Sequence, residues 1–164
     1  MTNHVTATFK TRESAENAVD RLIHAGFFQE DISLLVTDTT RGASFAIKQG
    51  DKSQEYEATG AEAGGVFGAI TALLISAAVI PSGGLALAAV GPVAATLAGL
   101  GVGGLTGGLL GALVGLGVPE HEAKLFETDV KSGGILLAVA ATNNDEKKLA
   151  EKILKNTEAT KVAA

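Results

Sequence analysis

The feature that most constrains this chain is a stretch of 56 residues, 63–118, that contains no Asp, Glu, Lys, Arg or His. The stretch also holds 15 of the 21 glycines, a composition unlike that of a solvated surface loop. Pro81, Gly83 and Gly84 predict a hairpin turn within it, preceded by a helical arm over 61–80 and followed by a longer one. Because about 20 helical residues span roughly 30 Å of hydrocarbon, each arm is long enough to cross a lipid layer.

Small residues recur at every fourth position of the second arm, in the pattern of a glycine zipper. Such spacing lets helix backbones approach closely, which predicts packing between helices. Eight glycines between positions 99 and 115 cost a solitary helix about 8 kcal/mol relative to alanine, so the arm needs a compensating environment. The residues predicted to form the helix-packing and oligomerisation surface are Gly64, Gly68, Gly99, Gly103, Gly107, Gly111 and Gly115.

Two environments can supply this compensation, and the sequence leaves both open. A lipid bilayer favours helices because an unpaired backbone polar group is costly there. Against lipid stand the Ala-rich and Gly-rich composition and the acidic flanks, Glu62 and Glu120, where membrane spans often carry Lys or Arg anchors. The alternative is a soluble homo-oligomer in which the hairpins are buried between subunits.

The segments on either side of this insert, 1–60 and 119–164, are expected to form one α/β domain interrupted by residues 61–118. A length of 164 residues suits one domain with an elaboration better than two cores. Apolar residues alternate over 5–9 and again over 32–36, which predicts two strands.

A helix is predicted between these strands, capped by Thr11 and closed by Gly26. Phe27 and Phe28 follow it and are expected to cap the core or to touch a partner. A third strand is predicted around Phe45 and Ile47, after a polar turn.

Beyond the insert, Pro119 predicts the start of a second helix, and residues 134–142 predict a buried central strand followed by a last helix. Without the insert this is the ferredoxin-like β-α-β-β-α-β order with a C-terminal helix, an α+β fold whose two crossing helices cover one sheet face. The opposite face, with Leu35, Leu136 and Ala138, then needs a separate cover.

Composition excludes several classes of function. The net charge is −5 without a basic block, so nucleic acid is not an expected partner. The chain has no cysteine, which rules out disulfides and thiolate metal sites. The polar N-terminus lacks the profile of a secretory signal. We therefore place the α/β domain in the cytoplasm and its hairpin in the cytoplasmic membrane, with a wholly cytoplasmic protein as the alternative.

The motifs that could carry chemistry are weak. Residues 99–104 match GxGxxG, but the flanking residues are small or apolar and the glycines continue at a period of four, unlike a dinucleotide-binding turn. His4, His24 and His121 show no metal-ligand spacing. We expect no catalytic residue, no cofactor and no metal site.

The glycine ladder, the sequence Gly-Val-Pro-Glu-His-Glu-Ala over 117–123 and the sequence Val-Lys-Ser-Gly-Gly over 130–134 carry a resemblance to a known family. They resemble the bacterial general-stress, YflT-like family, some members of which are named low-temperature-induced proteins. The likeness covers nearly the whole chain and departs from the family at residues 82–84, where a more proline-rich turn is expected. The resemblance implies a stress-associated protein, often described as a membrane protein, without catalytic residues.

These observations predict a non-enzymatic, stress-associated membrane protein that oligomerises through its glycine-zipper hairpin and supports or remodels the membrane. Its expected partners are copies of itself and a lipid bilayer. The first alternative is a soluble homo-oligomeric particle or filament. The second is an α/β module that senses a small ligand on its exposed sheet face.

Overall fold

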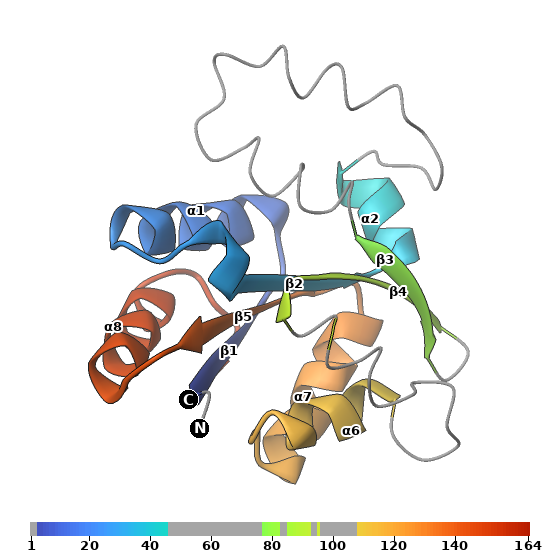
Figure 1. The fold of residues 1–164 in the computed structure, drawn as a ribbon. Helices are drawn as coiled ribbons and strands as arrows, with labels where there is room; N and C mark the ends of the chain where they lie inside the picture. The colour runs from blue at the N-terminus through green and yellow to red at the C-terminus, as the bar shows by residue number, and fades with distance from the viewer. Residues whose placement is uncertain (1–2, 46–76, 83–84, 93–94, 96–107) are drawn as a thin grey trace.

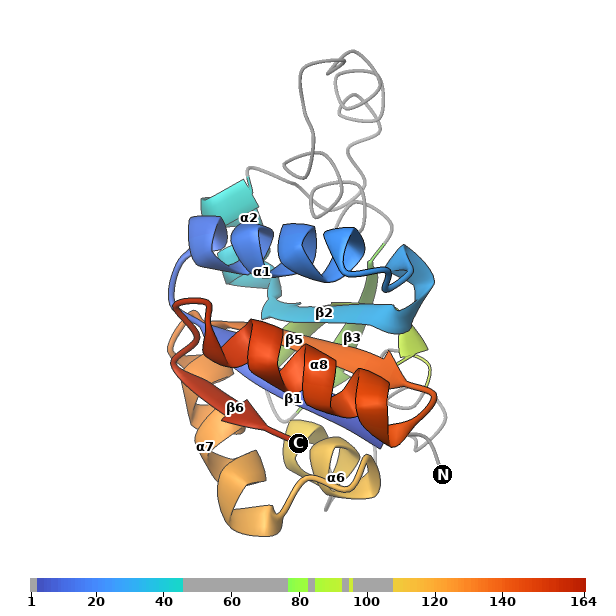
Figure 2. The same cartoon turned by 90° about the vertical axis from the view of Figure 1, so that its left-hand side faces the viewer.

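The structure, a computed structural model, describes residues 3–45, 77–82, 85–92, 95 and 108–164. Over these residues the chain forms a six-stranded sheet with helices on both faces (Figures 1 and 2). The described strands are β1 (Asn3–Phe9), β2 (Ile32–Thr37), β3 (Ala78–Ser82), β4 (Leu85–Val90), β5 (Ile135–Ala141) and β6 (Lys161–Ala163). The described helices are α1 (Arg12–His24), η1, a 3₁₀ turn (Gln29–Asp31), α2 (Asp38–Phe45), α6 (Gly108–Gly115), α7 (Glu120–Lys131) and α8 (Asn144–Lys155).

The strand order of the sheet is β3-β4-β2-β5-β1-β6, and every neighbouring pair is antiparallel. β5 lies between β1 and β2, so that Val139 is the partner of both Val5 and Ile32. β1 and β2 therefore run parallel to each other and are joined by α1, as a split β-α-β unit. The predicted α+β class is confirmed, whereas the ferredoxin-like order of elements is not.

The predicted third strand is wrong at Phe45, because this residue ends helix α2. The Thr37 hydroxyl accepts the backbone N–H of Thr40 at 3.1 Å, and Asp38 lies in the first turn, where a negative charge is favourable. The polar residues that suggested a turn thus begin a helix. Ile47 lies outside the described residues.

The two predicted signals at the ends of α1 are confirmed, and α8 has a cap that was not predicted. The Thr11 hydroxyl accepts the N–H of Ser14 at 3.2 Å and caps α1. Gly26 has a φ of 100°, the left-handed conformation expected after a helix. The Asn143 side chain caps α8 by accepting two backbone N–H groups. Pro119 stands at the N-cap of α7, one position before its predicted place.

Helices α1 and α8 cover one face of the sheet, and α6 and α7 cover the other. β5 serves both cores, because Leu137 packs on the first side while Leu136 and Ala138 pack on the second. The predicted buried central strand is therefore confirmed. The two predicted crossing helices, α1 and α7, lie on opposite faces, because the apolar stripe of α7 packs against the face that contains Leu35, Leu136 and Ala138.

Part of the uncharged stretch belongs to this domain. The prediction that helix continues to Ile80 is wrong, because β3 and β4 form an antiparallel hairpin at the edge of the sheet. Ser82 and Leu85 are paired in the antiparallel ladder, so the predicted reversal of the chain is present. It joins two strands and not two helices. Pro81 lies within β3, where an edge position tolerates the missing N–H. Helix α6 contributes Leu109 and the following apolar residues to the second core.

Candidate functional site

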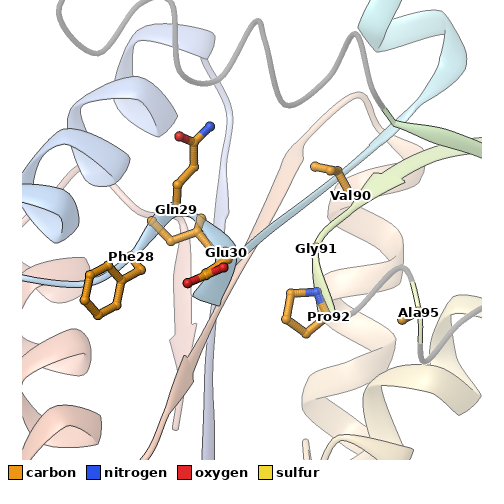
Figure 3. Close-up of a pocket in the computed structure, with 8 residues that line it drawn as sticks. Phe28, Gln29, Glu30, Val90, Gly91, Pro92 and Ala95 are labelled. Carbon is orange, nitrogen blue, oxygen red and sulfur yellow. The ribbon is translucent and has the colours of Figure 1, made fainter.

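An open groove with a volume of about 700 Å³ lies where β2 begins and β4 ends (Figure 3). Its walls come from three places in the chain: η1 with the residue before it, the start of β2, and the end of β4 with the turn after it. The described residues that line it are Phe28, Gln29, Glu30, Ile32, Val90, Gly91, Pro92 and Ala95.

Gly91 brings two of these walls together. Its φ is 91°, and a Cβ atom at this position would lie 2.6 Å from the carbonyl oxygen of Ile32 and 2.7 Å from the hydroxyl oxygen of Ser33. Real Cβ atoms do not approach other atoms this closely, so the backbone can pass over the start of β2 only with glycine here. The contact fixes the position from which Pro92 lines the groove.

Phe27 and Phe28 follow Gly26, and their side chains differ in solvent exposure. Phe27 is 7% exposed and packs into the core under α1, whereas Phe28 is 68% exposed. The Phe28 side chain also lines a second, smaller hollow of about 210 Å³, which it shares with Asp31, Glu146 and Leu149 among others. One aromatic side chain thus stands between two hollows.

All charged residues among the described lining residues of both hollows are acidic. Glu30 lies between Phe28 and Pro92 in the groove (Figure 3), and the smaller hollow has Asp31 and Glu146. Glu146 accepts a hydrogen bond from the backbone N–H of Thr142 at 2.7 Å and so stabilises the start of α8. Carboxylates beside an exposed ring are chemically suited to a cationic group on an apolar stem.

A third hollow, of about 430 Å³, lies between α1 and the turn after α8. Four of its polar side chains are bonded in two pairs. The Ser14 hydroxyl donates to a Glu158 carboxylate oxygen at 2.9 Å, and the Arg21 Nε donates to the Asn17 side-chain oxygen at 2.7 Å. The Ser14–Glu158 bond ties the C-terminal turn to α1, and the Arg21–Asn17 bond lies within α1, so these groups have a structural role.

The predicted helix-packing glycines are only partly described. Gly111 and Gly115 lie in α6, on the opposite side from the buried Leu109, Ala112 and Leu113. Among the described residues, no atom beyond the helix itself and its chain neighbours lies within 4 Å of where a Gly111 Cβ would be. The glycines of the packing surface that lie outside the described residues are Gly64, Gly68, Gly99, Gly103 and Gly107. The turn residues Gly83 and Gly84, and the GxGxxG match at 99–104, also lie outside them.

Among the residues that the structure describes, three groups have shifted pKa values, and none of them lines the groove. The pKa of His24 is raised by a hydrogen bond with the backbone carbonyl of Asp20, at 2.9 Å, and by the Asp20 carboxylate. The Glu120 and Lys124 side chains pair at 2.9 Å, which lowers the pKa of Glu120 and raises that of Lys124. Each pair joins positions i and i+4 on an exposed helix surface, a stabilising arrangement without a catalytic geometry.

In the part of the chain that the structure describes, no group of three or more His, Asp or Glu residues could hold a metal ion. His4, His24 and His121 come from β1, α1 and α7, and the structure brings them to no common site. The helices within the described ranges include none that is long and apolar enough to cross a membrane.

Residues 4–92 match the family model of the heat induced stress protein YflT domain. The matched range includes β1, α1, β2, α2, β3 and β4, the groove up to Pro92, and the close contact at Gly91. No curated protein and no solved structure matches the chain. Since the match covers more than half of the sequence, this chain belongs to the family of heat induced stress proteins that contain a YflT domain.

Proposed function

We propose that this protein is a non-enzymatic, stress-associated protein that assembles with copies of itself through its uncharged stretch. Membership of a heat induced stress protein family associates it with stress. The supporting observation is the position of α6. This helix uses Leu109 and Leu113 to cover the sheet, while Gly111, Gly115 and the 43% exposed Val114 remain on its other side. The last turns of the glycine ladder are thus available to a second helix.

Attachment to a membrane is the second candidate, supported by the absence of charge over 63–118. The residues taken up by β3, β4 and α6 limit the length of chain that could cross a membrane. They leave at most residues 61–77 and 91–107 for the two arms, which is 17 residues each. Even a complete helix of this length reaches only about 25 Å, less than the roughly 30 Å of a hydrocarbon core. Self-assembly therefore accounts better for the uncharged stretch.

Substituting Gly111→Leu tests the proposed assembly. The open space at this position accepts the side chain, and leucine is a better helix former than glycine by about 0.8 kcal/mol, so the domain should keep its stability. A leucine would nevertheless prevent a second helix from approaching α6. We expect the mass of the full-length protein in native mass spectrometry or light scattering to fall by at least about twofold.

The matched control is Thr128→Leu, which places the same leucine side chain on the exposed side of α7. An unchanged mass for Gly111→Leu, or an equal fall in mass for both variants, would contradict the assembly proposal. Flotation with lipid vesicles followed by an alkaline carbonate wash separates the two candidates. Protein that floats and survives the wash supports the membrane candidate, and a defined particle that stays at the bottom supports self-assembly.

A further inference from the structure

An acidic and aromatic patch lies at one end of the face covered by α1 and α8. We define it as Phe28, Glu30 and Asp31. Phe28 is 68% exposed, although burying a phenylalanine side chain stabilises a protein by about 1.5–3 kcal/mol. Within the described residues no ion pair engages Glu30 or Asp31. The patch therefore combines an unused apolar surface with two available negative charges.

A basic stripe lies on the exposed side of α8. We define it as Lys148, Leu149 and Lys152, which share one helix side because Lys148 and Leu149 lie four and three positions before Lys152. Leu149 is 41% exposed. Lys155 pairs with Glu151, whereas Lys148 and Lys152 have no ion-pair partner in the described part of the chain. The stripe therefore combines an exposed apolar side chain with two available positive charges, whereas the patch combines one with two negative charges.

The two surfaces adjoin each other. Phe28 and Asp31 line the smaller hollow together with Leu149, so the apolar members of patch and stripe face a common space. Glu146 also lines this hollow, but its carboxylate accepts hydrogen bonds from the Thr142 N–H and the Asn143 side chain. Figure 2 shows that α8 begins at the end of the sheet where the segment between α1 and β2 lies, and that it runs away from this segment. The order across the surface is therefore acidic, apolar, basic, with Lys152 one turn farther along α8 than Lys148.

A surface with this order is complementary to itself. When a second copy faces the first and is rotated by 180°, apolar groups meet at the centre, and the acidic patch of each copy meets the basic stripe of the other. Every charge contact then occurs twice. We infer that this surface binds a second copy of the chain as an isologous dimer, independently of the glycine-rich surface of α6.

Charge reversal tests this inference on the full chain in the Gly111→Leu background, where the α6 surface is already obstructed. The acidic patch is reversed by Glu30→Lys with Asp31→Lys, and the basic stripe by Lys148→Glu with Lys152→Glu. Each variant alone brings like charges together twice and should raise the dimer dissociation constant at least about tenfold. Mixed one to one, the two variants carry opposite charges at both contacts, so their heterodimer should recover to within about threefold of the parent dissociation constant.

Because the chain contains no cysteine, contact across the dimer can be trapped directly. A copy with Phe28→Cys and a copy with Leu149→Cys should form a mixed disulfide, and the charge reversals should abolish it unless they are combined. Circular dichroism checks that the variants fold, as expected for exposed or half-exposed positions. Restored association in the mixture supports the dimer. A parent protein that stays monomeric, or a mixture that associates no better than either variant, would overturn it and leave the surface for another occupant, such as a basic amphipathic peptide.

Discussion

At the residue scale, single positions with special backbone conformations decide how the sheet is assembled. Thr11 and Gly26 could be assigned from the sequence, because a cap and a helix-closing glycine act on their immediate neighbours. Gly91 could not be assigned, since the atoms that exclude a side chain there belong to Ile32 and Ser33, nearly sixty positions earlier. The exposure of Phe28 was likewise unpredictable beside a buried Phe27.

Gly91→Ala should destabilise the domain by about 2–4 kcal/mol, because it adds a steric clash with Ile32 to the cost of a left-handed backbone. Gly26→Ala is the matched control: its φ is 100° and no atom of the described part of the chain lies within 4 Å of its Cβ position, so only the conformational cost of about 1–2 kcal/mol applies. Urea unfolding measures both free energies. Equal losses for the two variants would contradict a close contact between the groove walls.

At the element scale, prediction succeeded where one segment carries its own pattern. β1, α1, β2, β5 and α8 follow from alternation, helical spacing and caps. The hairpin of β3 and β4 was missed because an uninterrupted apolar run fits a buried strand as well as a helix. β6, with three residues, has too short a pattern to detect. The sequence did not show which helices cover the sheet face that contains Leu35, Leu136 and Ala138. One of them, α6, lies within the segment that was predicted to be an insert.

Leu113→Ala tests whether α6 is part of the domain. The Leu113 side chain is fully buried in the core under α6 and α7, so its truncation should lower the free energy of unfolding by about 2–4 kcal/mol. Val114→Ala, on the exposed side of the same helix, should change it by less than about 1 kcal/mol. If both variants unfolded like the parent protein in denaturant, α6 would not contribute to the core.

At the scale of the whole molecule, the domain extends beyond the family match. Residues 4–92 contain β1 and β2 but not β5, the strand that pairs with both. Without β5 no described strand joins β1 to the sheet formed by β2, β4 and β3. The groove could not be predicted from the sequence either, because its walls are brought together only by the pairing of β2 with β4.

A fragment of residues 1–92 should therefore not fold. We expect its amide proton spectrum to lack the dispersion of the full chain and its thermal unfolding to lose cooperativity, because two strands lose their shared partner. Adding a peptide of residues 119–164, which supplies α7, β5 and α8, is the control and should restore part of the dispersion. A fragment that folds cooperatively alone would show that the matched range is a complete domain.

The central position of β5 also orders events during synthesis. The ribosome makes the chain from its N-terminus, so β1, β2 and the whole uncharged stretch emerge before the strand that joins them. Until then both strands present unpaired edges beside an apolar segment, a combination that favours aggregation. The exposed state lasts until Ile135 and the rest of β5 have been made, so a chaperone that binds the nascent chain should raise the yield of folded protein.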